Sequence, residues 1–137
     1  MEVRGWLIDK SALVRLSDSP QATTWAERIN QGLVHLSTIT RLEIGYSARS
    51  GADLAKVMAS PIITKMAIEG ITPAIEERAW QSLQLLAKKG QHRAPSLADL
   101  LIAATAQLSE LTVLHIDKDF DLIGKVTGVK VERLKIT

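Results

Sequence analysis

The chain of 137 residues contains no cysteine, which excludes disulfide bonds and metal sites built on thiolates. Its three histidines, at positions 35, 92 and 115, do not form a His-x-x-x-His pair. A zinc site is therefore disfavoured, and oxygen atoms remain as the ligands for any bound metal. No stretch is long and apolar enough to span a bilayer, and residues 1–8 lack the hydrophobic region of a signal peptide. We therefore expect a cytoplasmic protein without a membrane segment.

The remaining composition is that of an ordinary globular protein. Apolar residues make up 46% of the chain and charged residues 23%. A chain of this length can bury a substantial core, so we expect a single domain spanning residues 1–137. The formal charge is only +2, although the isoelectric point is about 9.0. The basic balance is a weak indication of an anionic partner.

Short apolar runs alternate along the chain with segments that have helical periodicity or helix caps. This alternation predicts an α/β fold in which a central parallel β-sheet is flanked by helices on both faces. The predicted strands are 3–8, 33–36, 66–68, 112–116 and 129–134. Seven helices are predicted: 11–16, 21–31, 39–46, 52–59, 74–89, a long helix opened by Ser96, and 119–125. The expected N-cap is Ser19 for helix 21–31, and Thr38 or Thr40 for helix 39–46.

Four carboxylates occupy positions where an acidic side chain is unexpected. Asp9 and Asp117 each end a predicted strand, Asp99 lies in the first turn of an apolar helix, and Glu43 interrupts an apolar helical stripe. Acids are rarely set against apolar surface unless they are paired or bind a metal. In parallel sheets, ligands bind at the carboxyl ends of the strands, so all four carboxylates can reach one rim and bind a hard cation.

Three of these acids also have a simpler interpretation as helix caps. Asp9 and Asp117 can each cap the helix that follows, and Asp99 completes a capping box with Ser96. Glu43 has no such role. It shares a helical face with apolar residues, Arg41 is too close in sequence to pair with it, and Arg49 is a looser alternative.

Four segments, taken in order, resemble a PIN domain, and in particular the VapC-type toxins of bacterial toxin–antitoxin pairs. The resemblance rests on Leu7-Ile8-Asp9-Lys10-Ser11-Ala12-Leu13, Thr40-Arg41-Leu42-Glu43-Ile44, Leu97-Ala98-Asp99-Leu100-Leu101-Ile102-Ala103-Ala104-Thr105-Ala106 and Leu114-His115-Ile116-Asp117-Lys118-Asp119-Phe120. Their order and spacing extend over essentially the whole chain. One position departs from the pattern, because the family often has Thr or Ser where this chain has Lys10.

The resemblance implies a metal-dependent endoribonuclease that inhibits translation and growth. Asp9, Glu43, Asp99 and Asp117 would form the catalytic acidic site for Mg²⁺ or Mn²⁺, Asp119 would join or support it, and Ser11 would hydrogen-bond within it. Clustered carboxylates repel one another, and a divalent cation relieves this repulsion. In-line attack by water would leave a 5′-phosphate and a 3′-hydroxyl.

The substrate and partners are also implied by the resemblance. The substrate would be single-stranded or loop RNA, whose phosphates and bases can enter a shallow rim. Candidate RNA-binding residues are Lys10, Arg41, Arg93 and Lys118, followed by Arg15, Arg49 and His92. A cognate antitoxin would bind a homodimer, giving a heterotetramer or larger assembly, and the apolar faces of helices 39–48 and 52–59 could supply its groove.

Three alternative functions fit the sequence less well. A receiver domain needs an acidic pair after the first strand, but Lys10 follows Asp9. A haloacid-dehalogenase-like phosphatase needs Asp-x-Asp there, but the matching residue is Ser11. A non-catalytic PIN-like protein that binds RNA or a protein partner would have no use for self-repelling acids.

Overall fold

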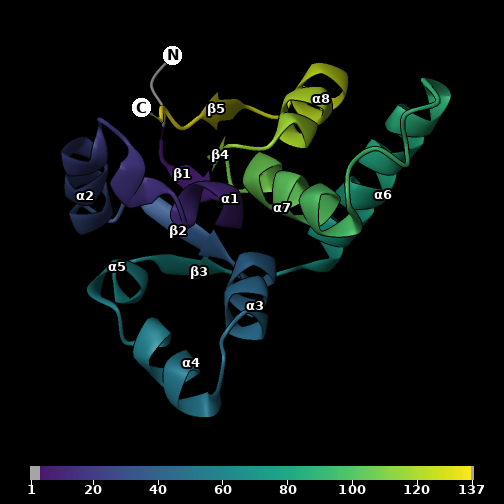
Figure 1. Cartoon of the computed structure of the whole chain (residues 1–137). Helices are drawn as coiled ribbons and strands as arrows, with labels where there is room; N and C mark the ends of the chain where they lie inside the picture. Colours follow the sequence, from purple (N-terminus) through teal and green to yellow (C-terminus); the bar gives the residue numbers. More distant parts are fainter. Residues whose placement is uncertain (1–3, 137) are drawn as a thin grey trace.

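A five-stranded parallel sheet forms the centre of the protein (Figure 1). The structure is a computed structural model and describes residues 4–136. The strand order is β3-β2-β1-β4-β5, with β1 in the middle and paired to both β2 and β4. The strands are β1 (Trp6–Ile8), β2 (Val34–Ser37), β3 (Ala67–Glu69), β4 (Thr112–His115) and β5 (Val131–Arg133). The predicted α/β class with a central parallel sheet is confirmed.

Helices cover both faces of the sheet, which explains why the central strands are apolar without alternation. On one face, Leu7 and Val113 pack against α6 (Pro73–Lys88), α7 (Leu97–Leu108) and α8 (Lys118–Thr127). On the other face, Ile8 and Leu114 pack with residues of α1 (Lys10–Leu13) and α2 (Ala22–Asn30). Neighbouring residues of one strand therefore belong to two separate cores, as expected for a sheet between two helical layers.

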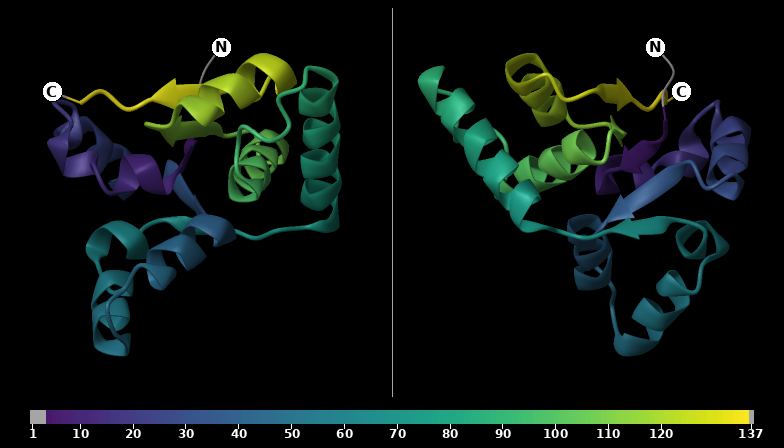
Figure 2. Two further views of the ribbon diagram at one scale, coloured as in Figure 1. Left: turned by 45° about the vertical axis from the view of Figure 1, so that its right-hand side comes forward. Right: turned by 180° about the vertical axis from the view of Figure 1, so that it is seen from behind.

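The remaining helices lie below the sheet in the view of Figure 1. They are α3 (Thr38–Tyr46), α4 (Gly51–Met58) and the short α5 (Pro61–Thr64). Figure 2 shows that α4 lies at the end of the molecule opposite α8. None of the helices formed by residues 4–136 is long and apolar enough to cross a lipid bilayer.

Several local predictions need correction. Ser19 does not cap α2: the N-cap is Gln21, and the Ser19 hydroxyl oxygen accepts the Gln21 N–H instead. The cap of α3 is Ser37, one residue before the range that the sequence indicated, and its hydroxyl accepts the Thr40 N–H. The predicted helix 11–16 is split into α1 and a 3₁₀ turn, η1 (Leu16–Asp18). The helix α5 was not predicted, because it has only four residues.

Candidate functional site

The site lies where the strand order reverses. Successive strands from β1 to β3 extend to one side of β1, whereas β4 and β5 lie on the other side. The β1–β4 junction is therefore the switch point at which ligands bind in parallel sheets. Asp9 directly follows β1, and its N–H donates to the carbonyl of Leu114 in β4 at 2.9 Å. Asp117 follows β4 by two residues, so both acids leave the sheet at this junction.

Ser11 connects the two strand ends. The Asp9 side chain is buried, and its Oδ2 accepts the backbone N–H of Ser11 at 3.1 Å and the Ser11 hydroxyl at 2.6 Å. The same hydroxyl oxygen accepts the N–H of Ile116, in the turn after β4, at 2.9 Å. Ser11 therefore holds the Asp9 carboxylate in one orientation and ties it to the segment that carries Asp117.

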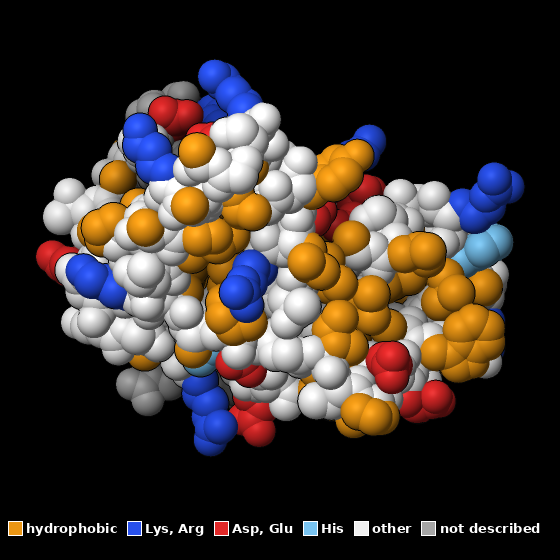
Figure 3. Space-filling view, turned by 90° about the horizontal axis from the view of Figure 1, so that it is seen from below, with side chains coloured by type: hydrophobic (Ala, Val, Ile, Leu, Met, Phe, Trp, Pro, Cys, Tyr) orange, Lys and Arg blue, Asp and Glu red, His pale blue; other side chains and the backbone are white. Residues whose placement is uncertain are grey.

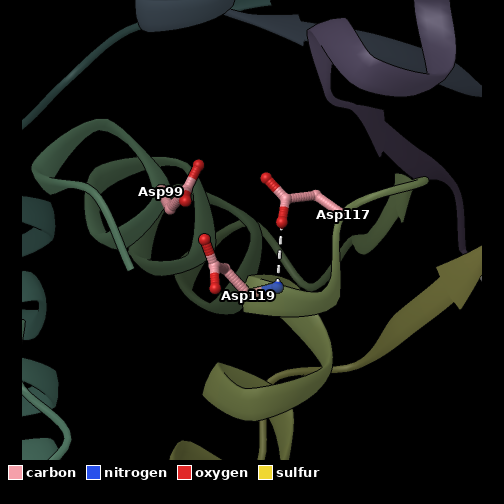
Figure 4. Close-up of side chains that lie close together, drawn as sticks. All are labelled: Asp99, Asp117 and Asp119. Atoms are coloured by element: carbon pink, nitrogen blue, oxygen red, sulfur yellow. Dashed lines mark hydrogen bonds between the residues drawn. The ribbon is translucent and has the colours of Figure 1, made fainter. Parts of the chain in front are cut away.

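Asp99, Asp117 and Asp119 converge from two elements (Figure 4). One carboxylate oxygen of each lies within 4.8 Å of the others, a spacing that a single cation could bridge. Asp99 and Ser96 form a capping box at the start of α7, and Asp117 caps α8 by accepting the Asp119 N–H at 2.9 Å. The capping interpretation of these acids is correct, and it is compatible with their convergence because each carboxylate has a second oxygen.

Glu43 lies on α3 and lines the same cavity. Its Oε1 is buried, and no donor among the described residues reaches it. None of the ion pairs between described residues includes Glu43, so neither Arg41 nor Arg49 serves as its partner. The cavity has a volume of about 420 Å³ and is lined by Asp9, Lys10, Ser11, Val14, Glu43, Ser96, Asp99, Asp117 and Asp119.

Burial and mutual repulsion make two of these carboxyl groups weak acids. Burial raises the pKa of Asp99 to about 6, the Ser96 hydrogen bonds oppose this shift, and the charges of Asp117 and Asp9 add to it. Burial and the charge of Asp9 likewise raise the pKa of Glu43, while the Lys10 ammonium lowers it. A bound cation would favour the ionised forms, because it offsets both the burial cost and the repulsion.

The structure separates the candidate RNA-binding residues into two groups. Lys10 lines the acidic cavity, and Arg41 lines a neighbouring groove. Arg93 and Lys118 are exposed and line neither. The Nε of Arg15 lies 2.9 Å from Oδ2 of Asp18, so this arginine is in an ion pair. Arg15, Arg49 and His92 are all exposed and lie outside both cavities.

The neighbouring groove is larger and mainly apolar. Its volume is about 840 Å³, and it is lined by Lys10, Thr38, Ile39, Arg41, Leu42, Glu43, Gly45, Tyr46, Leu54 and Met58. Lys10 and Glu43 therefore border both cavities. The groove joins α3 and α4, the helices whose apolar faces the sequence singled out.

The PIN domain model matches residues 6–126, which include every acid of the cavity. The chain belongs to the PIN domain family. It is 57% identical over 129 residues to Ribonuclease VapC2 of Mycobacterium tuberculosis (strain CDC 1551 / Oshkosh), covering 94% of this chain and 92% of the relative. It is 37% identical over 123 residues to Ribonuclease VapC51 of Mycobacterium tuberculosis (strain ATCC 25618 / H37Rv), covering 90% and 88% of the two chains.

Solved structures share the PIN fold. The VapBC complex of Salmonella typhimurium bound to DNA contains a chain that matches with a TM-score of 0.76 and 21% identity. The match covers 94% of this chain and 97% of that chain. At this identity the likeness concerns the arrangement of the backbone alone.

Two residues of this PIN domain contribute to the site without having been predicted to do so. Ser47 accepts a hydrogen bond from the Lys10 ammonium at 2.6 Å, and lies one helical turn after Glu43. His115 is fully buried, and its Nδ1 accepts the N–H of Asp117 at 3.1 Å. The spacing of Ser47 from Glu43 could have indicated the first contact. No sequence signal distinguishes His115 from an ordinary packed histidine.

The raised pKa of Asp99 predicts how stability depends on pH in the absence of metal. Between pH 4 and 6 the folded protein retains a proton on Asp99 that the unfolded chain, with an ordinary pKa of 3.8, has released. Wild type should therefore lose stability as pH rises through this window. Asp99→Asn should lack the contribution of Asp99 to this pH dependence. Thermal melts in chelator between pH 4 and 7.5 measure the difference.

Glu76→Gln is the matched control, since Glu76 is a first-turn acid of α6 outside the cavity. Its melting temperature should follow the wild-type pH profile. If the melting temperatures of wild type and Asp99→Asn changed with pH in parallel, the ionised Asp99 carboxylate would not be destabilised by its surroundings.

Proposed function

We propose that this chain is a metal-dependent endoribonuclease and the toxin of a VapBC-type toxin–antitoxin pair. The observation that carries the proposal is the cavity at the β1–β4 junction, where five carboxylates converge. The 57% identity to a relative named as a ribonuclease supports RNA as the substrate. We place its action in the cytoplasm, where an RNA substrate and a newly made antitoxin would be present.

The donor set fits Mg²⁺ or Mn²⁺. Every charged oxygen in the cavity belongs to a carboxylate, and hard divalent cations prefer oxygen ligands. The Oε1 of Glu43 is buried without a donor among the described residues, and burial raises the pKa of Asp99; a bound cation would stabilise both carboxylates. We assign Asp9, Glu43, Asp99 and Asp117 as the ligand and catalytic set, with Asp119 as a further ligand.

When bound, the cation would lower the pKa of a coordinated water and stabilise negative charge on the scissile phosphate. The protein contributes orientation. Ser11 fixes the Asp9 carboxylate, Ser96 fixes Asp99, and the Asp119 N–H fixes Asp117, each through hydrogen bonds to one oxygen. These contacts keep the carboxylates close together in spite of their repulsion, so little reorganisation is needed when the metal and substrate bind.

The shape of the cavity favours flexible RNA. It opens at a rim with Lys10 and, beside it, Arg41, while Arg93 and Lys118 are exposed further out and could contact the backbone at greater distance. A single strand or loop can place one phosphate into such a cavity, whereas an intact helix keeps its phosphates at fixed spacing. Trp6 and Phe120 are buried, so neither is available to stack on bases.

Asp9→Asn and Asp99→Asn test the ribonuclease proposal. Each should reduce Mn²⁺-dependent cleavage of single-stranded RNA by at least about 100-fold, because each removes a charged ligand from the acidic site. Excess chelator should abolish wild-type cleavage, and Glu43→Gln should relieve growth inhibition when the chain is expressed. Gel analysis of end-labelled RNA and growth curves provide the measurements.

Glu76→Gln is again the control, because Glu76 is an exposed acid in the first turn of α6, outside the cavity. It should cleave within about twofold of wild type, as expected for a substitution away from the reacting groups. Equal cleavage in excess chelator would refute the metal mechanism. Retention of RNA binding without any cleavage by wild type would favour the alternative, a non-catalytic PIN-like regulator that binds RNA or protein.

We further propose that the apolar groove between α3 and α4 receives the antitoxin. Leu42 is 64% exposed and Tyr46 92% exposed, although both line the groove. Seen from below, hydrophobic side chains gather across this face of the molecule (Figure 3).

An amphipathic helix can bury its apolar face in such a groove. Because Lys10 and Glu43 border both cavities, the bound segment would also approach the acidic site. A homodimer carrying two antitoxin chains is the assembly that we expect.

Leu42→Glu tests the groove. It places a charge in the apolar surface and should weaken antitoxin binding by at least about tenfold, so that growth inhibition persists when both proteins are expressed. The matched control is Ala55→Glu, which adds the same charge to an exposed position of α4 outside the groove. Pull-down of the protein encoded by the adjacent gene compares the binding of the two variants. Equal binding by both would exclude the groove as the antitoxin-binding site.

A further inference from the structure

The acidic cavity contains one basic side chain, that of Lys10, among the residues that line it. Five carboxylates surround it, yet none of the ion pairs formed within residues 4–136 includes Lys10. Its ammonium is near enough to lower the pKa of Glu43, so the two charges interact without direct contact. A half-buried lysine that avoids available carboxylates needs a structural explanation.

Ser47 supplies that explanation. The Lys10 Nζ donates to the Ser47 hydroxyl oxygen at 2.6 Å, and the Ser47 hydroxyl in turn donates to the carbonyl of Glu43 at 3.0 Å. The last turn of α3 therefore both carries Glu43 and positions the ammonium. An ammonium has three N–H donors, and Ser47 uses one of them. Two donors remain for a ligand that enters the cavity.

Lys118 offers an internal comparison. Lys10 and Lys118 both directly follow a strand-end aspartate, and both are the first residue of a helix. Lys118 is exposed and lies outside the cavity, whereas Lys10 is half-buried and lines it. The sequence placed both residues among the RNA-binding candidates, and the structure distinguishes them.

We propose that Lys10 binds a non-bridging oxygen of the RNA phosphate that enters the acidic cavity, and is thus a substrate-binding residue of the cleavage reaction. This inference rests on the proposed ribonuclease function. A phosphodiester carries a negative charge into a cavity rich in carboxylates, and an ammonium at the rim reduces the electrostatic cost. A compact ammonium with rotatable donors suits a single phosphate oxygen.

The contact would also strengthen during the reaction. Attack on phosphorus increases the negative charge on the non-bridging oxygens, so a cation that touches one of them binds the transition state more tightly than the ground state. Loss of the ammonium should therefore reduce the rate constant as well as the affinity. A lysine that merely offsets carboxylate repulsion would affect metal binding and stability instead.

The test compares Lys10→Met with Lys125→Met in the 137-residue chain. Lys125→Met removes the same charge from an exposed position in the last turn of α8, outside the cavity. Anisotropy of a fluorescein-labelled single-stranded RNA in Ca²⁺ measures binding, and single-turnover cleavage in Mn²⁺ measures the rate. Lys10→Met should weaken RNA binding and slow cleavage by at least about tenfold each. Lys125→Met should stay within about twofold of wild type for both. The increase in melting temperature on adding Mn²⁺ should be retained or larger in Lys10→Met, because a repelling charge is removed.

Two results would overturn the proposal. The first is RNA binding and cleavage by Lys10→Met within about twofold of Lys125→Met, which would make Lys10 a solvated rim residue. The second is loss of the Mn²⁺-induced stabilisation in Lys10→Met, which would mean that Lys10 only supports the carboxylates. Absence of cleavage by wild type would refute the ribonuclease proposal alone, and the comparison of RNA binding would then decide the role of Lys10.

Discussion

The parallel pairing of β1 with β4 is the constraint on which the site depends. These strands are more than 100 positions apart in the sequence, yet Ile8 pairs with Leu114 and the Asp9 N–H bonds to the Leu114 carbonyl. The pairing brings the two strand-end acids together at the switch point. Asp99 joins them from α7, which packs against the face of the sheet that carries Leu7 and Val113. The negative cavity is therefore a consequence of the sheet topology together with the positions of a few acids.

Clustering of these acids costs free energy, and the helix termini reduce this cost. Asp9, Asp99 and Asp117 each lie at the start of a helix and accept backbone N–H groups. Such groups stabilise a carboxylate while leaving its second oxygen available to a cation. The role of cap and the proposed role of ligand are thus complementary. Glu43 lacks this support, because it lies within α3 and its Oε1 has no donor among the described residues.

Much of the fold and the convergence of the acids could be predicted from sequence. The apolar runs that became β1 and β4, and the Ser96–Asp99 capping box, depend on local patterns that the chain displays directly. The cap of α3 and the four-residue α5 were missed, because short elements and their exact starts depend on tertiary packing. The difference between Lys10 and Lys118 was also beyond the sequence. It arises because α3 lies beside α1 and presents Ser47 to Lys10, a contact between residues 37 positions apart.

The central claim is that these carboxylates form one divalent cation site, and the most direct test is to locate the metal. Crystals of the protein grown or soaked with Mn²⁺ would give an anomalous difference map at the manganese absorption edge. The account predicts a strong peak within about 2.5 Å of carboxylate oxygens of Asp99 and Asp117, with further oxygens from Asp9, Glu43 or Asp119. An empty cavity at saturating Mn²⁺, with a peak bound only elsewhere, would contradict it.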